Sequence, residues 1–113
     1  IYPENSVVYT GTHDTDTAVG WYRDLPKKMK KDALRLLGEG PEAVNWKMIR
    51  KALSSRADTA IIPVQDICGL GSAARFNSPG QGKGQWEWRL EEGCLKSKDM
   101  TRLAKLTEES ERR

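Results

Sequence analysis

The chain has 113 residues and a formal net charge of +3, which suits one small domain with a single hydrophobic core. Charged residues make up 31% of it with both signs interleaved, a pattern that gives no reason to expect a nucleic-acid or membrane partner. We expect neither a membrane span nor a signal peptide. The cysteines, Cys68 and Cys94, lack the spacing of a metal site, and we expect reduced thiols rather than a disulfide.

A β-branched run, Val7–Thr10, predicts a short buried strand near the start of the chain. Six polar side chains follow it in residues 12–17, among them the only histidine, His13, and two carboxylates, Asp14 and Asp16. Loops at strand ends carry the chemistry of α/β enzymes, because the strand fixes the backbone while the loop presents its side chains. This loop is therefore the candidate functional site.

Helical spacing of apolar residues predicts two helices after this loop. The first is expected from an N-cap at Asp24 to Leu37, and the second from Pro41 to about Ser54. The residues expected to face inward are Met29, Ala33, Leu36, Leu37, Trp46, Ile49 and Leu53. Basic residues, Lys47 among them, are expected on the solvent-facing sides.

A second apolar run, Thr59–Asp66, predicts another short strand that ends in a polar Gln-Asp pair. Pro63 is expected in its last residues, because proline cannot donate to a strand ladder. After a glycine-rich turn and a loop, the alternation in Gln85–Arg89 predicts an extended segment with both tryptophans on one face. A final helix is expected from about Ser97 to Arg112.

The order of these elements bears on the fold class. Two strands joined by a helical crossover run parallel, and two parallel strands alone do not make a stable sheet. We therefore predict an α/β piece of a larger domain: the C-terminal part of a (β/α)8 TIM barrel, with about its last two strands and their helices. Residues 1–113 are expected to form one segment with no internal domain boundary, and not a complete fold.

Three interpretations of His13, Asp14 and Asp16 are open. A metal site would need ligands from elsewhere, and no second histidine or nearby cysteine exists, so we expect no metal. The side chains could instead satisfy the turn after the strand through hydrogen bonds to its backbone. The third interpretation is an active-site carboxylate beside an imidazole, which suits carbohydrate chemistry because fixed carboxylates stabilise an oxocarbenium-like transition state.

Three blocks of the sequence resemble, in the same order, motifs of the 4-α-glucanotransferases (amylomaltases or disproportionating enzymes, glycoside hydrolase family 77). They are Val8–Thr17 with Gly20-Trp21, Ser55–Asp66 with Gly69-Leu70-Gly71, and Ala74–Gly80 with Gln85–Arg89. The resemblance implies a barrel segment around the seventh and eighth strands. It implies a retaining enzyme that transfers α-1,4-glucan segments between maltooligosaccharides. Its expected partners are this substrate and the remainder of the barrel, and we expect no cofactor.

The resemblance also implies roles for four residues. Asp14 matches the carboxylate that stabilises the transition state, and His13 matches a histidine that contacts the same sugar. Asn77 matches a loop asparagine near the acceptor side. Thr15 stands where the family usually has Asn, so a substrate contact there would have a shorter reach. The nucleophile Asp and the acid/base Glu of the family have no match here, so the isolated segment is expected to be inactive.

Two other kinds of function are open on the sequence alone. A stand-alone carbohydrate-binding module would stack sugars on Trp21, Trp86 and Trp88. A small basic nucleic-acid binder would fit the isoelectric point of about 9.0, although the interleaved acidic residues argue against it. The expected location is the cytoplasm, or the plastid stroma if the source is a plant or alga.

Overall fold

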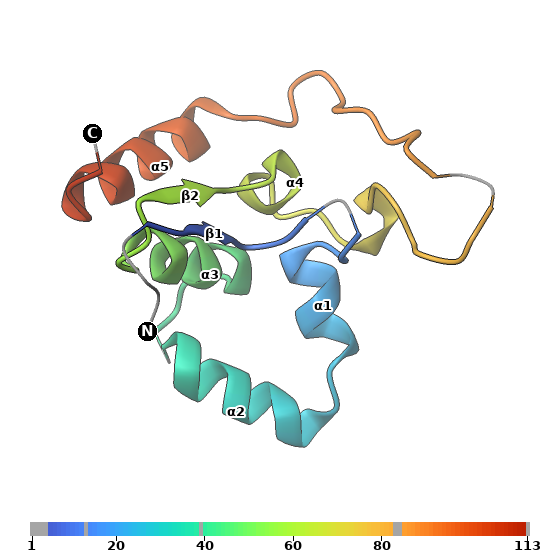
Figure 1. Ribbon diagram of the computed structural model, residues 1–113, viewed down its shortest axis with the longest axis horizontal. Helices are drawn as coiled ribbons and strands as arrows, with labels where there is room; N and C mark the ends of the chain where they lie inside the picture. The colour runs from blue at the N-terminus through green and yellow to red at the C-terminus, as the bar shows by residue number, and fades with distance from the viewer. Residues whose placement is uncertain (1–4, 13, 39, 83–84, 113) are drawn as a thin grey trace.

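A parallel two-stranded sheet organises the computed structural model, which describes residues 5–12, 14–38, 40–82 and 85–112 (Figure 1). Strand β1 (Val7–Tyr9) pairs with β2 (Thr59–Ile61), and the register places Val8 beside Ala60. The parallel pairing predicted from the sequence is confirmed. The barrel to which we assign these strands is still a prediction.

Helices fill the crossover between the strands and the chain beyond them. They are α1 (Ala18–Asp24), α2 (Lys27–Leu37), α3 (Val44–Leu53), α4 (Val64–Ile67), the 3₁₀ turn η1 (Ser72–Ala74) and α5 (Ser97–Glu109). Helix α3 is central, since it packs against α1, α2, α4 and α5. Within the part of the chain that the structure describes, no helix is long and apolar enough to span a membrane.

The core lies on both sides of α3. One cluster joins α3 to α4 and α5 and contains Trp46, Ile49, Leu53, Ile67 and Leu106. A second cluster, Val8, Ala52 and Ala57, joins α3 to one face of the sheet. Ala60 in the middle of β2 and Ile62 directly after the strand pack against both clusters. The apolar stripe predicted for α3 is therefore confirmed.

No described residue covers the other face of the sheet. Side chains of a strand alternate between faces, and this face carries Val7, Tyr9 and Ile61, which are 46%, 49% and 46% exposed. Only Val8 of β1 is buried, so the prediction of a buried strand is right for Val8 and wrong for Val7 and Tyr9. Parallel sheets are normally covered on both faces, and an apolar face this exposed is suited to packing against further protein.

Local predictions failed around α1 and α2. Helix α1 was not predicted, and Asp24 is its last residue rather than the N-cap of the next helix. Helix α2 begins after Pro26 with no side-chain cap, and Met29 and Leu36 on it are exposed. On α3, Lys47 is buried instead of solvated.

Three further differences lie in the second half of the chain. Strand β2 ends at Ile61, so Pro63 precedes α4 instead of closing the strand. The backbone turns at Trp86, where φ is 61°, so Gln85–Arg89 is not an extended segment. Helix α5 begins at Ser97, as expected, and ends at Glu109, before the expected Arg112. It has no side-chain cap, and its buried residue is Leu106.

Glu42 links α5 to α3 through ion pairs with two arginines. Its carboxylate accepts two hydrogen bonds of 3.0 Å from Arg50 on α3 and one of 3.0 Å from Arg102 on α5. The Arg102 guanidinium also lies over the Trp46 ring, 4.6 Å from its centroid. The hydrogen bonds from Arg50 hold the pKa of Glu42 below its ordinary value of 4.5, against the effect of desolvation, and Arg102 adds to the lowering.

We predict that Glu42→Gln lowers the free energy of unfolding by about 0.5 to 1 kcal/mol at pH 7, a value reduced for the partial exposure of these ion pairs. A carboxylate with a lowered pKa stabilises the fold above its unfolded value and loses this effect as the pH falls. The difference from wild type should therefore shrink below pH 4.5. Urea unfolding of the full-length protein measures it, with Glu92→Gln, an exposed carboxylate outside this cluster, as the control.

Candidate active site at the strand ends

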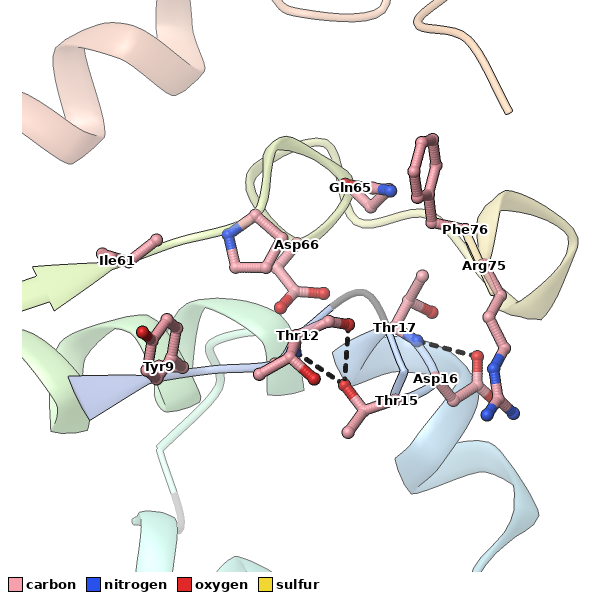
Figure 2. A pocket seen from close by; sticks show the side chains of 12 residues that line it. Tyr9, Thr12, Thr15, Asp16, Thr17, Ile61, Gln65, Asp66, Arg75 and Phe76 are labelled. Atoms are coloured by element: carbon pink, nitrogen blue, oxygen red, sulfur yellow. Dashed lines mark hydrogen bonds between the residues drawn. The ribbon is translucent and has the colours of Figure 1, made fainter. Parts of the chain in front are cut away.

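A cavity of about 400 Å³ opens where both strands end (Figure 2). Its walls come from the ends of β1 and β2, the polar loop after β1 and residues 75–76. They are formed by Tyr9, Gly11, Thr12, Thr15, Asp16, Thr17, Ile61, Pro63, Gln65, Asp66, Arg75 and Phe76. Parallel pairing brings both strand ends to one edge, so the two polar segments predicted from the sequence meet here.

Asp14 precedes Thr15 of the cavity wall and is held by a distant loop. The side-chain amide of Asn77 donates to its carboxylate at 2.7 Å, and the guanidinium of Arg75 donates to its carbonyl oxygen at 2.9 Å. Arg75 also donates to the carbonyl oxygen of Asn77 at 2.9 Å, which fixes the two loop residues to each other. The structure thus brings together two predicted site residues, Asp14 and Asn77. The third, His13, lies outside the described residues.

Thr15 uses its hydroxyl to close the loop on itself. The hydroxyl accepts from the Thr12 amide at 2.8 Å and donates to the Thr12 carbonyl oxygen at 3.1 Å. This is the backbone-satisfying role that one interpretation gave to this polar run. Thr15 also lines the cavity, so a substrate contact there is compatible with its position and is still a prediction.

Asp16 joins the loop to the start of α1 and to η1. Its carboxylate accepts from the Thr17 amide and from the Ser72 hydroxyl, both at 2.7 Å. Thr17 in turn caps α1 by accepting from the Gly20 amide at 3.1 Å. These contacts assign Asp16 and Thr17 to the local structure of the loop.

Asp66 is a buried carboxylate at the same edge, only 1% exposed. It accepts from the Thr10 hydroxyl at 2.6 Å and from the Ala18 amide at 2.7 Å. Figure 2 shows its side chain pointing toward the loop after β1. The sequence marked the Gln65-Asp66 pair only as a weaker second polar end, and it did not indicate these partners.

The cysteines are free thiols, as expected from the sequence. Burial is the main reason that the pKa of Cys68 is raised to about 11, and a hydrogen bond with the Cys94 side chain is the second. Across residues 5–12, 14–38, 40–82 and 85–112, no three His, Cys, Asp or Glu side chains form a group that could hold a metal ion.

Sequence reasoning missed two features of this site. Arg75 received no role, because its contacts are with backbone oxygens and so leave no complementary residue type in the sequence. The tryptophans were expected on one face, but Trp86 packs edge-on against Phe76, with ring centroids 4.8 Å apart, whereas Trp88 lines a separate groove beside Leu70. The two tryptophans therefore have different neighbours.

Comparison with known proteins gives consistent matches. The model of the 4-alpha-glucanotransferase family matches residues 1–96. The chain is 49% identical over 87 residues to the chloroplastic/amyloplastic 4-alpha-glucanotransferase of Arabidopsis thaliana, covering 76% of this chain and 15% of that protein. It is 41% identical over 119 residues to the 4-alpha-glucanotransferase of Thermus thermophilus, covering 98% and 24%.

Comparison with solved structures also finds a protein of this kind. The structure of an amylomaltase from Streptococcus agalactiae in complex with acarbose matches with a TM-score of 0.94 at 28% identity. That match covers 98% of this chain and 23% of the amylomaltase. The chain thus spans between 15% and 24% of the length of these relatives.

Gly20 offers a test of how tightly α1 is packed at this site. A Cβ placed there would overlap the Ser72 hydroxyl and would lie 2.6 Å from the Asp16 carboxylate. Gly→Ala inside a helix ordinarily stabilises it by about 0.5 to 1 kcal/mol. We predict that Gly20→Ala instead destabilises the protein by roughly 1 to 3 kcal/mol, because the added methyl group breaks the Asp16–Ser72 contact.

The measurement is the thermal melting temperature of the full-length protein. Gly82→Ala is the control, since no atom of the described residues lies within 4 Å of the added Cβ there. A Gly20→Ala variant that melts at or above the wild-type temperature would contradict the close packing of α1 against the loop.

Proposed function

The chain belongs to the 4-alpha-glucanotransferase family, and we propose that it is the C-terminal barrel segment of an enzyme that transfers α-1,4-glucan segments between maltooligosaccharides. In this proposal Asp14 is the carboxylate that stabilises the transition state, with His13 as its sugar-binding neighbour. The nucleophile and the acid/base belong to the part of the enzyme outside this segment.

The fixation of Asp14 is the observation that carries the proposal. Its carboxylate and its carbonyl oxygen receive separate hydrogen bonds from Asn77 and Arg75, while the residue itself is exposed beside Thr15, which lines the cavity. A carboxylate that is both held and accessible suits a transition state with positive charge on the sugar ring. Sugar hydroxyls can also donate to it, which favours binding of a distorted ring.

The proposed substrate is an α-1,4-glucan, and the similar amylomaltase in complex with acarbose supports it. In the retaining reaction the nucleophile displaces the glycosidic oxygen, which takes a proton from the acid/base. The 4-hydroxyl of a second glucan then displaces the nucleophile and gives its proton to the acid/base residue, which restores both residues to their starting forms. Asn77 and Thr15 are proposed to contact substrate beside Asp14.

The remainder of the barrel is the proposed partner of the uncovered sheet face. Val7, Tyr9 and Ile61 present an apolar surface that further strands and the barrel interior would bury. The proposed location is the cytoplasm, or the plastid stroma for a plant or algal source, as in the chloroplastic relative.

We predict that Asp14→Asn in the full-length enzyme lowers kcat by roughly a hundredfold to a thousandfold, because it removes one preorganised charge at the transition state. Asparagine keeps an oxygen that can accept from Asn77, so the loop should hold its shape. Glucose released from maltotriose by transfer gives the rate. Asp58→Asn, an exposed carboxylate just before β2, is the control, and near-normal transfer by Asp14→Asn would refute the assignment.

We also predict that the native polypeptide in its source is several times heavier than 12.7 kDa, the mass of this segment. The reason is that one carboxylate of three cannot run a double displacement. An antibody raised against residues 97–109 and a denaturing gel give the mass. A native chain of 12.7 kDa would instead favour a binding module or an inactive remnant.

A further inference from the structure

We infer that Asp66 is a positioning residue for the proposed transfer reaction, because its buried carboxylate ties together the two ends of the loop that carries Asp14. The inference rests on the proposed function and adds to it a residue that the resemblance did not assign. Asp66 is the anchor and Asp14 is the group that meets the sugar.

The two hydrogen bonds of Asp66 fall on either side of the loop. One oxygen accepts from the hydroxyl of Thr10, the residue directly after β1, at 2.6 Å. The other accepts from the amide of Ala18, the first residue of α1, at 2.7 Å. The Asp66 side chain thus fixes the distance between the end of β1 and the start of α1, which are the two ends of the loop.

Asp66 can act as an anchor because it is itself held from outside the loop. It belongs to α4, the helix that follows β2 in the chain. Its carbonyl oxygen accepts from the side-chain amide of Asn45 on α3 at 2.7 Å. Its amide donates to the Pro63 carbonyl oxygen at 3.0 Å. Asn45 is also buried, at 3% exposed, so the contact joins two packed helices.

The environment of Asp66 favours positioning over direct contact with a sugar. Its carboxylate is 1% exposed although the residue lines the cavity, and each oxygen is occupied by a donor of the chain itself. A buried carboxylate is tolerated only where such hydrogen bonds replace its hydration. Asp14, by contrast, is exposed at the far side of the same loop.

The loop is therefore clamped from two directions. Asp66 holds its ends, and Arg75 with Asn77 holds the middle at Asp14. Loosening the ends lets Asp14 move relative to the sugar, and a displacement of about 1 Å at a reacting centre can cost a hundredfold in rate. Since Asp14 is proposed to act on the transition state, the loss should appear in kcat more than in KM.

The test uses the full-length enzyme with maltotriose as substrate. Asp66→Ala removes both contacts and should lower kcat roughly tenfold to a hundredfold with little change in KM. Asp66→Asn should recover most of the rate, because its amide oxygen can accept from Ala18 and its amide nitrogen can donate to the Thr10 hydroxyl.

Thr10→Val removes only the contact at the strand end and should lower kcat less than Asp66→Ala. Thr107→Val makes the same chemical change on α5, where the hydroxyl donates to the Leu103 carbonyl oxygen, and should leave kcat unchanged.

A double-mutant cycle separates positioning from a general structural role. If Asp66 acts through Asp14, then Asp66→Ala should cost little further rate in the Asp14→Asn background. An equal fold-loss in both backgrounds, or a loss confined to KM, would overturn the inference while the proposed function stands. Full activity of Asp14→Asn would overturn the proposed function itself. If Asp66→Ala does not fold, Thr10→Val takes its place in the cycle, and wild-type kcat for Thr10→Val would then refute the inference.

Discussion

Parallel pairing of β1 with β2 is the constraint on which the rest of this structure depends. It sends both strand ends to the same edge, so Thr10 and Asp66 meet although 56 positions separate them. It also obliges the chain between the strands to cross over, which places α1, α2 and α3 in that interval. The candidate site is thus a product of topology first, and of local sequence second.

Those same strands show why the segment is suited to a larger assembly. One face of the sheet packs through Val8 against α3, whereas the other leaves Val7, Tyr9 and Ile61 nearly half exposed. Apolar area left in water forgoes about 25 cal/mol for each Å² that could be buried. A partner surface that covers this face therefore stabilises the strands and, through them, the loop at their ends. The span of at most 24% of its relatives' length fits that dependence.

The fold was predictable wherever one strong local signal dominated. The strands followed from β-branched runs, and α3 from an apolar stripe that includes Trp46 and Ile49. Helix α1 was missed because Gly20 is a poor helix former, and its presence is explained by the lack of room for a Cβ there. Trp86 was misjudged because alternation implies a side only if the backbone is extended, and here it turns. Such packing and turn constraints are set by residues far away in the chain.

The sequence was enough to predict the location of the candidate site and its residue types. It was not enough to predict which carboxylate is buried and which is exposed. Asp14 and Asp66 are both carboxylates after a strand, and spacing alone could not separate them. What distinguishes them is solvation: Asp66 is buried with two hydrogen-bond donors, whereas Asp14 is exposed and accepts from Asn77 in a distant loop. A buried carboxylate whose oxygens each accept a hydrogen bond from the protein stabilises structure, whereas an exposed one can also accept from a ligand. If Asp14 has the role proposed for it, that role depends on Asp66, because Asp66 is attached to both ends of the loop that carries Asp14.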